Sequence, residues 1–252
     1  MRLASLGSGS KGNATLVQSG STLLMVDCGF SLRETTRRLD RLGLEPGQLQ
    51  AILVTHEHSD HCSGVARLSA KYQIPVYLTH GTASSGRCDG AHELRCFNCD
   101  EEFALGDIVV RTVAVPHDAA EPCQYLLSAN ERQLGILTDL GCITPHVVAS
   151  YRACHSLLLE FNHDLDMLMA GDYPPRLKQR VGGDWGHLNN EQAADLLRQL
   201  DCSSSLSNLV VAHISENNNS RECAERALGA VLASTESVVW AEQADGFPWL
   251  SV

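Results

Sequence analysis

Four side chains that commonly bind metal ions lie within one six-residue segment of this chain. The segment reads His56-Glu57-His58-Ser59-Asp60-His61, and it follows the apolar run Ala51-Ile52-Leu53-Val54. Imidazole and carboxylate groups together suit zinc and its first-row neighbours. A polar turn that arose by chance is the alternative, but such groups are costly to bury at the end of a core strand without partners. The cluster therefore predicts a metal site at a strand end.

The spacing within this segment favours two metal ions over one. His56 and His58 are two residues apart, so on an extended backbone their side chains point to the same side and can share one ion. Asp60 and His61 fall where we expect the chain to turn into a helix, within reach of a second ion. Neither pair completes a coordination sphere, so further ligands are expected elsewhere in the chain.

The composition is that of a globular enzyme. The chain has 252 residues, of which 44% are hydrophobic and 19% charged, and no linker divides it, so we expect one domain over residues 1–252. No run of 18 apolar residues indicates a membrane span, and Met1–Gly7 reaches a glycine too early for a signal peptide. Ten scattered cysteines then predict reduced thiols and a cytoplasmic protein.

The charge balance limits the kinds of partner. A net charge of −11 argues against a protein that coats nucleic acid. It leaves room for an enzyme that holds a strand with a local basic patch, because several of the carboxylates would be neutralised as metal ligands.

The apolar pattern predicts two mainly β halves, each with helices. Such halves favour an α/β architecture with two sheets packed face to face and helices outside. The expected strands are Leu3–Ser8, Thr22–Asp27, Ala51–Thr55, Val76–Thr79, Ile108–Val115, Cys123–Ser128, Leu134–Leu137, Ser156–Phe161, Leu209–Ala212 and Val238–Ala241. The expected helices are one opened by a Ser31/Glu34 capping box and running to about Leu42, then Ser63–Tyr72, Asn190–Leu200 and Arg221–Leu232.

Three more residues end apolar strands in the same way as His56. They are His117, Asp139 and His213. A lone histidine in such a place is more often a hydrogen-bonded surface residue, but three such residues in a chain that already carries the cluster favour metal ligands. A carboxylate has two oxygens that can face two ions, so Asp139 is a good bridging ligand.

This set of residues resembles the metallo-β-lactamase-fold hydrolases. The resemblance covers nearly the whole chain and implies a four-layer αβ/βα sandwich with a dinuclear site. It implies that one ion binds His56, His58 and His117, that the other binds Asp60, His61 and His213, and that Asp139 bridges them. β-Lactamases usually carry a cysteine where Asp139 stands, which favours the nuclease and phosphodiesterase branches.

Two later segments, residues 157–164 and 186–190, resemble motifs of the nuclease-like members. In tRNase Z-like enzymes a glutamate after a strand and a histidine that opens a helix protonate the leaving group together, and Glu160 and His187 match those places. The segments 7–13 and 173–178 are similar to those of the YycJ/WalJ-like branch. That likeness implies a DNA exonuclease of 5′-to-3′ polarity.

The expected chemistry is metal-dependent hydrolysis of phosphodiester bonds. Two divalent ions, zinc or manganese, would generate a hydroxide, and His187 held by Glu160 would protonate the leaving alkoxide. Asp60 joins this pair as the third catalytic residue. The alternatives are a strand-end carboxylate that bonds an amide for Glu160, and a helix-start residue that bonds the backbone for His187.

Basic and glycine-rich segments predict how a nucleic acid, DNA by the resemblance, is held. The loop Gly7–Asn13 can cradle a phosphate through its amides, Lys11 and Asn13, or it can be a plain turn. Arg176, Lys178 and Arg180 can bind backbone phosphates. A small-molecule hydrolase (a cyclic phosphodiesterase, or a thioester or lactone hydrolase) and a non-catalytic metal or redox module are the alternatives. The sequence leaves the metal, DNA against RNA and the oligomeric state open.

Overall fold

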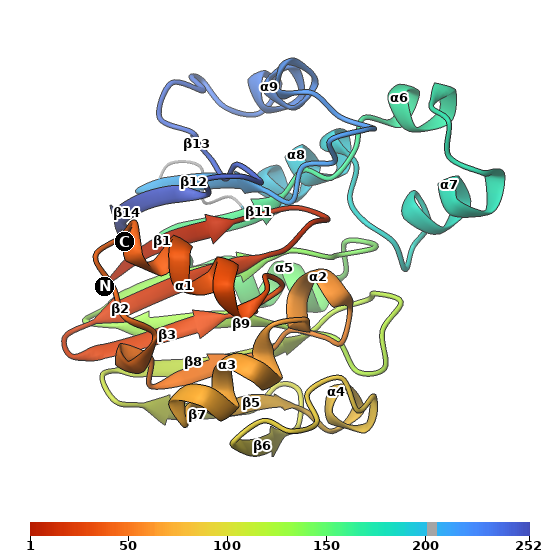
Figure 1. Cartoon of the computed structure of the whole chain (residues 1–252). Helices are drawn as coiled ribbons and strands as arrows, with labels where there is room; N and C mark the ends of the chain where they lie inside the picture. Colours follow the sequence, from red (N-terminus) through yellow and green to blue (C-terminus); the bar gives the residue numbers. More distant parts are fainter. Residues whose placement is uncertain (201–205) are drawn as a thin grey trace.

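The computed structural model describes residues 1–200 and 206–252 and contains two mixed sheets with helices on their outer faces (Figure 1). Within these residues, no helix is both long and apolar enough to cross a membrane. The four-layer αβ/βα sandwich expected from the sequence is confirmed.

The first sheet has the strand order β14-β1-β2-β3-β4-β5-β6. Its first three pairings are antiparallel and its last three are parallel. Its strands, in chain order, are β1 Arg2–Gly7, β2 Ala14–Ser19, β3 Thr22–Val26, β4 Ala51–Leu53, β5 Pro75–Thr79, β6 Glu93–Phe97 and β14 Phe247–Ser251.

The second sheet repeats this plan with the order β7-β8-β9-β10-β11-β12-β13. Again three antiparallel pairings are followed by three parallel ones. Its strands are β7 Glu102–Leu105, β8 Ile108–Ala114, β9 Cys123–Ala129, β10 Arg132–Leu137, β11 Ser156–Glu160, β12 Asn208–Ala212 and β13 Val239–Trp240.

Helices follow the parallel strands, as crossover connections require. In the first half they are α1 Leu32–Asp40, the short 3₁₀ turn η1 Pro46–Gln48, α2 Ser59–Cys62, α3 Val65–Tyr72 and α4 His80–Ser84. In the second half they are α5 Pro145–Tyr151, α6 Leu165–Ala170, α7 Pro175–Val181, α8 Asn190–Leu200 and α9 Arg221–Gly229. Helices α6 and α7 stand away from the sheets on one side of the molecule (Figure 1).

Three buried clusters hold the layers together. The central cluster includes Leu24 from the first sheet and Leu127 from the second. An outer cluster joins Met25 of β3 to Leu39 of α1, and a third joins the second sheet to α5, α8 and α9. Leu24 and Met25 are neighbours that lie in different clusters, because successive side chains of a strand point to opposite faces.

Several expected boundaries are corrected by the structure. The helix expected over 190–200 is α8 residue for residue, but the one expected over 63–72 begins only at Val65, as α3, because Ser63 and Gly64 separate it from the short helix α2. A Cβ atom at Gly64 would lie 2.0 Å from the carbonyl oxygen of Phe30, so the chain turns where it packs on that backbone. Helix α1 ends at Asp40 and α9 at Gly229, both earlier than expected.

The capping box expected at α1 forms only in half. The Ser31 side chain accepts a hydrogen bond from the Glu34 amide at 3.3 Å. The Glu34 carboxylate does not return to Ser31, because it forms ion pairs with Arg37 and Arg38 instead.

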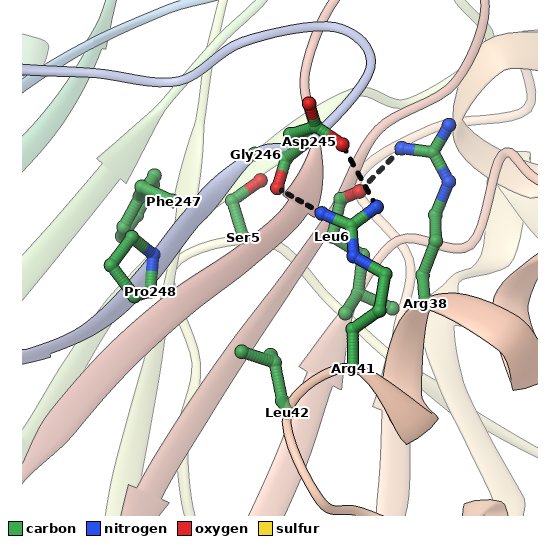
Figure 2. A pocket seen from close by; sticks show the side chains of 9 residues that line it. All are labelled: Ser5, Leu6, Arg38, Arg41, Leu42, Asp245, Gly246, Phe247 and Pro248. Atoms are coloured by element: carbon green, nitrogen blue, oxygen red, sulfur yellow. Dashed lines mark hydrogen bonds and ion pairs between the residues drawn. The ribbon is translucent and has the colours of Figure 1, made fainter.

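Two arginines at the end of α1 bind the first strand and the segment just before β14 (Figure 2). Arg41 contacts the Asp245 carbonyl and carboxylate oxygens at 3.1 and 3.0 Å, and Arg38 donates to the Leu6 carbonyl. These residues line a pocket of about 300 Å³ that contains no histidine among its lining residues. Both guanidinium groups bind oxygen atoms of the protein, so they join neighbouring segments of the fold. The expected metal ligands do not line this pocket.

Several cysteines in the described part of the chain are free thiols. Cys202 lies outside the described residues. The cytoplasmic location, which was inferred from the cysteines, stays a prediction. Free thiols are present at Cys28, Cys62, Cys88, Cys96, Cys99, Cys123, Cys142 and Cys223.

Candidate metal centre

The histidine and aspartate side chains meet where strands of both sheets end. His56 follows β4 and His117 follows β8, while Asp139 and His213 follow β10 and β12. Helix α2 begins at Ser59 and carries Asp60 and His61, as the sequence predicted for the end of the cluster. The carboxyl ends of neighbouring parallel strands share one edge of a sheet, which explains why residues far apart in sequence converge here.

All seven residues expected to bind metal come together in overlapping groups. Within each group the possible ligand atoms lie within 4.8 Å of one another. The groups are His56, His58 and His117; His56, His61 and Asp139; Asp60, His61 and His213; and Asp139, His187 and His213. The first and third groups are the two ligand sets that the resemblance implies, and Asp139 shares groups with residues of both sets.

The backbone at this edge adopts an uncommon conformation. Asp27, Asp139 and His213 each end a strand with a positive φ, at 60°, 50° and 52°. Residues other than glycine rarely adopt this left-handed region, and such residues often occur at functional sites. All three side chains are buried, Asp27 accepts a hydrogen bond from His61, and the backbone carbonyl of His213 accepts one from Asn162.

The buried polar atoms of the cluster fit a bound cation. The Nε2 atoms of His56 and His213 are buried without a hydrogen-bond partner, which is unusual for buried polar groups. Burial, reinforced by the nearby charge of His61, lowers the pKa of His56 well below its ordinary value, so this imidazole stays neutral. A neutral imidazole with a free Nε2 is the form that binds a metal ion.

Asp139 is anionic in spite of its burial. Burial alone would raise its pKa, but the charges of His213 and His61 outweigh burial and hold the pKa well below the usual range. Its carboxylate lies 3.0 Å from His61 Nε2 and 3.8 Å from His213 Nδ1. His117 Nε2, from the other set, lies 3.9 Å from the same carboxylate, so Asp139 faces imidazoles of both sets and suits a shared ligand.

Partners behind the cluster orient three of its imidazoles. Asp27 Oδ2 accepts from His61 Nδ1 at 2.8 Å, and the Thr55 hydroxyl lies 3.0 Å from His56 Nδ1. The Gly186 carbonyl accepts from His117 Nδ1 at 2.9 Å. Hydrogen bonds of this kind fix the ring nitrogen that is left for a metal.

Sequence reasoning missed Asp27 and Asn162, which stand behind the ligands. The signal for Asp27 was available, since it ends an apolar strand as His56 does. Asn162 donates to the His213 carbonyl at 3.2 Å, and nothing in its local sequence indicates this contact.

Glu160 and His187 form a pair beside the cluster. Glu160 Oε2 lies 3.1 Å from His187 Nδ1, while its Oε1 accepts from the amides of Leu140 and Leu188. The sequence offered two interpretations of Glu160, a carboxylate that bonds amides and a partner of His187. Both contacts are present, because one oxygen bonds the amides and the other bonds the histidine. Hydrogen bonds from His187 and His213 overcome the effect of burial and lower the pKa of Glu160 to about 2.

A pocket of about 460 Å³ opens over these residues. His58, Asp60 and His187 line it, together with Arg87 and Arg180. The Arg180 guanidinium forms an ion pair with Asp118, a carboxylate that lies 3.4 Å from His117 Nε2 and that sequence reasoning did not select.

The other residues expected to bind substrate lie elsewhere. Lys11, Asn13, Arg176 and Lys178 are not among the residues that line this pocket. Lys11 pairs with Glu216 at 2.6 Å, and Lys178 donates to the Met169 carbonyl at 2.6 Å. Of the predicted basic patch, only Arg180 reaches the pocket.

The glycine-rich loop 7–13 is held by hydrogen bonds between its own residues. Asn13 is buried, and its side-chain oxygen accepts from the Gly9 amide at 2.8 Å. Its side-chain nitrogen lies 3.1 Å from His61 Nε2. The Lys11 amide donates to Gln243. These contacts favour the turn that borders the site over a phosphate cradle.

Comparisons with known proteins agree with this geometry. The family profile described as "Beta-lactamase superfamily domain" matches residues 22–214. The chain is 34% identical over 235 residues to the exodeoxyribonuclease YycJ of Bacillus anthracis, which covers 90% of this chain and 87% of the relative. It is 33% identical over 239 residues to the exodeoxyribonuclease WalJ of Streptococcus pneumoniae serotype 2, which covers 92% and 88%.

A solved structure also shares the fold. The metallo-β-lactamase fold protein YhfI from Bacillus subtilis superposes with a TM-score of 0.78 over 99% of this chain and 98% of YhfI. The two sequences are 16% identical, so this likeness concerns the fold alone.

Proposed function

The chain belongs to the metallo-β-lactamase-fold superfamily of metal-dependent hydrolases, in the branch of YycJ and WalJ, and on that premise we propose that it is a phosphodiesterase that degrades nucleic acid. The substrate we propose is DNA, attacked from its 5′ end. The names of the two curated relatives, both exodeoxyribonucleases, support this choice.

The observation that carries the proposal is the pair formed by Glu160 and His187 beside Asp139. An alkoxide is a poor leaving group and needs a proton as the bond to phosphorus breaks. His187 Nδ1 is directed at Glu160, which leaves Nε2 of the ring to deliver that proton. A thioester releases a thiolate, which can leave without a proton, so this pair favours phosphodiester chemistry over thioester hydrolysis.

The residues that would hold the metal ions follow from the groups described above. We propose that His56, His58 and His117 hold one divalent ion, that Asp60, His61 and His213 hold a second, and that Asp139 binds both. When bound, zinc or manganese ions supply an activated water molecule and neutralise charge on phosphate oxygens. Asp60 keeps its catalytic assignment because it lies on the pocket wall among these groups.

Both sheets contribute residues to the site, which bears on how many domains the chain forms. We propose a single domain over residues 1–252, since strand ends of both sheets contribute to the cluster and β14 returns to the first sheet. A cytoplasmic location remains part of this proposal.

One assay tests the function directly. Protein freed of metal with a chelator and reloaded with zinc or manganese is given end-labelled single- and double-stranded DNA, RNA and bis-p-nitrophenyl phosphate. The expected result is stepwise release of nucleotides from the 5′ end of DNA by the reloaded protein and none by the metal-free protein. Hydrolysis of the small diester without cleavage of any polynucleotide would favour the small-molecule hydrolase instead.

A further inference from the structure

Trp185 is an exposed aromatic residue whose chain neighbour Gly186 lines the pocket. Its side chain is 62% exposed, while the other tryptophans, Trp240 and Trp249, are each covered by an arginine. Val181, Gly186 and His187, which stand close to it in the chain, all line the pocket. The ring of Trp185 is therefore open to a ligand that binds in the neighbouring polar site.

The backbone that carries Trp185 is fixed to the site. The Trp185 carbonyl accepts a hydrogen bond from the Asp118 amide at 2.9 Å, and the Gly186 carbonyl accepts from His117 Nδ1 at 2.9 Å. On its other side, a Cβ atom at Gly141 would lie 2.6 Å from the Trp185 Cα. The backbone that carries the ring is therefore fixed close to the proposed ligand His117 and the proposed acid His187.

Charge in the same pocket suits a bound phosphate. Arg180 and Arg87 line the pocket, and Arg180 is carried by α7, just before Trp185. An aromatic face combined with cations is the arrangement by which proteins bind unpaired nucleic acid, because every base can stack on the ring while the cation holds the backbone.

We propose that Trp185 is a stacking platform for an unpaired base next to the phosphodiester that is cut. The inference rests on the proposed function and adds the form of the substrate, a single-stranded or frayed end of nucleic acid. Trp185 acts on affinity and register and does not take part in proton transfer or metal binding.

The test compares Trp185→Ala and Trp185→Phe with Met169→Ala. Met169 is 63% exposed and lies on α6, and neither it nor its chain neighbours Leu168 and Ala170 line the pocket, so it is the control. Binding of phosphorothioate-protected oligothymidylate to the metal-loaded protein is measured by fluorescence anisotropy. Stacking on one base predicts that Trp185→Ala raises Kd roughly 5- to 150-fold, whereas Trp185→Phe and Met169→Ala change it little.

A second substrate separates stacking from a general change at the pocket. An oligothymidylate with an abasic terminal unit should bind wild-type protein as weakly as the normal strand binds Trp185→Ala, and the variant should bind both strands equally. The metal content of all the proteins, measured by elemental analysis, should be the same, because Trp185 is not a proposed ligand.

Three results would overturn the inference. One is an unchanged Kd in Trp185→Ala, and another is an equal abasic effect in both proteins. A third is a change of oligomeric state in Trp185→Ala on sedimentation, which would assign the ring to a protein contact. Failure of the proposed function would appear differently, as a wild-type protein that neither binds nor cuts any polynucleotide, and it would remove this inference as well.

Discussion

Asp27 Oδ2 and His61 Nδ1 lie 2.8 Å apart, although 34 positions separate them in the chain. The other oxygen of the Asp27 carboxylate accepts from the Thr55 amide at 2.8 Å. Asp27 therefore ties the end of β3 to the segment after β4 and leaves His61 Nε2 facing Asp60 and Asp139. The carboxylate orients a proposed ligand without being one.

Asp27→Asn is expected to weaken metal binding while it leaves every proposed ligand in place. Loss of a carboxylate behind a ligating histidine typically lowers metal affinity about 10- to 100-fold. Competition with a fluorescent chelator measures the change. Asp40→Asn, at the exposed end of α1, is the control and should match the wild type. Equal affinities in all three proteins would show that Asp27 only joins two strands.

Asp139→Ala is expected to lower the content of both ions. Asp139 belongs to groups that include residues of both proposed ligand sets, whereas His58 belongs only to the first. Elemental analysis should therefore find about two ions per chain in the wild type, a loss at both sites in Asp139→Ala, and a loss confined to one in His58→Ala. A wild-type protein that stays metal-free in excess zinc and manganese would contradict the whole assignment.

The sequence was informative where chemistry is local. The segment 56–61 carries its ligand types side by side, and His117, Asp139 and His213 each follow an apolar run, so the cluster could be assembled before the fold was known. The apolar pattern also predicted the face-to-face sheets. Helix α8 was predicted without error because its apolar residues recur at helical spacing over three turns.

Other elements left no such pattern. Strand β2 was missed because nearly all of it is buried, so apolar and polar residues do not alternate along it. Helix α7 has no buried residue and therefore no apolar stripe to detect. The placement of Lys11 and Lys178 depends on partners distant in sequence, Glu216 and the Met169 carbonyl, and a local basic pattern cannot reveal which cations are already engaged.

Glu34→Gln should reduce stability in a way that depends on pH. Hydrogen bonds from Arg37 and then Arg38 lower the pKa of Glu34 from 4.5 to about 2. Because the folded pKa lies below the unfolded one, the stabilisation is present above pH 4.5 and disappears as the pH falls towards 2. The carboxylate is partly exposed, so solvent screening limits the effect to about 1 kcal/mol.

Urea unfolding of both proteins between pH 2 and pH 7 measures this difference. Glu191→Gln is the matched control, since Glu191 also lies in the first turn of a helix, α8. A difference between the wild type and Glu34→Gln that stays constant down to pH 2 would contradict the prediction.

Arg180 should account for most of the effect of the predicted basic patch. It lines the pocket, whereas Arg176 and Lys178 do not. Each phosphate contact adds about 0.7–0.9 to the slope of log affinity against log salt. Arg180→Ala should flatten the slope for DNA by about that amount and raise KM, and Lys178→Ala should do less. Arg198→Ala, on exposed α8 surface beside Asp195, is the control. A triple variant of residues 176, 178 and 180 with wild-type KM and slope would make the patch ordinary surface.

His187→Ala separates proton donation from metal binding. His187 Nδ1 lies 3.1 Å from Glu160 and 3.5 Å from Asp139. The geometry therefore allows His187 to act either as a proton donor or as a metal ligand. If His187 is the acid, the variant keeps its metal content and loses roughly 10²–10⁴ in turnover of DNA. It should hydrolyse bis-p-nitrophenyl phosphate almost as well as the wild type, because p-nitrophenolate leaves without a proton. Glu160→Gln should show the same split between substrates, since its amide cannot hold the ring in the same way. A loss of metal from His187→Ala, or equal losses on both substrates, would instead place His187 among the ligands.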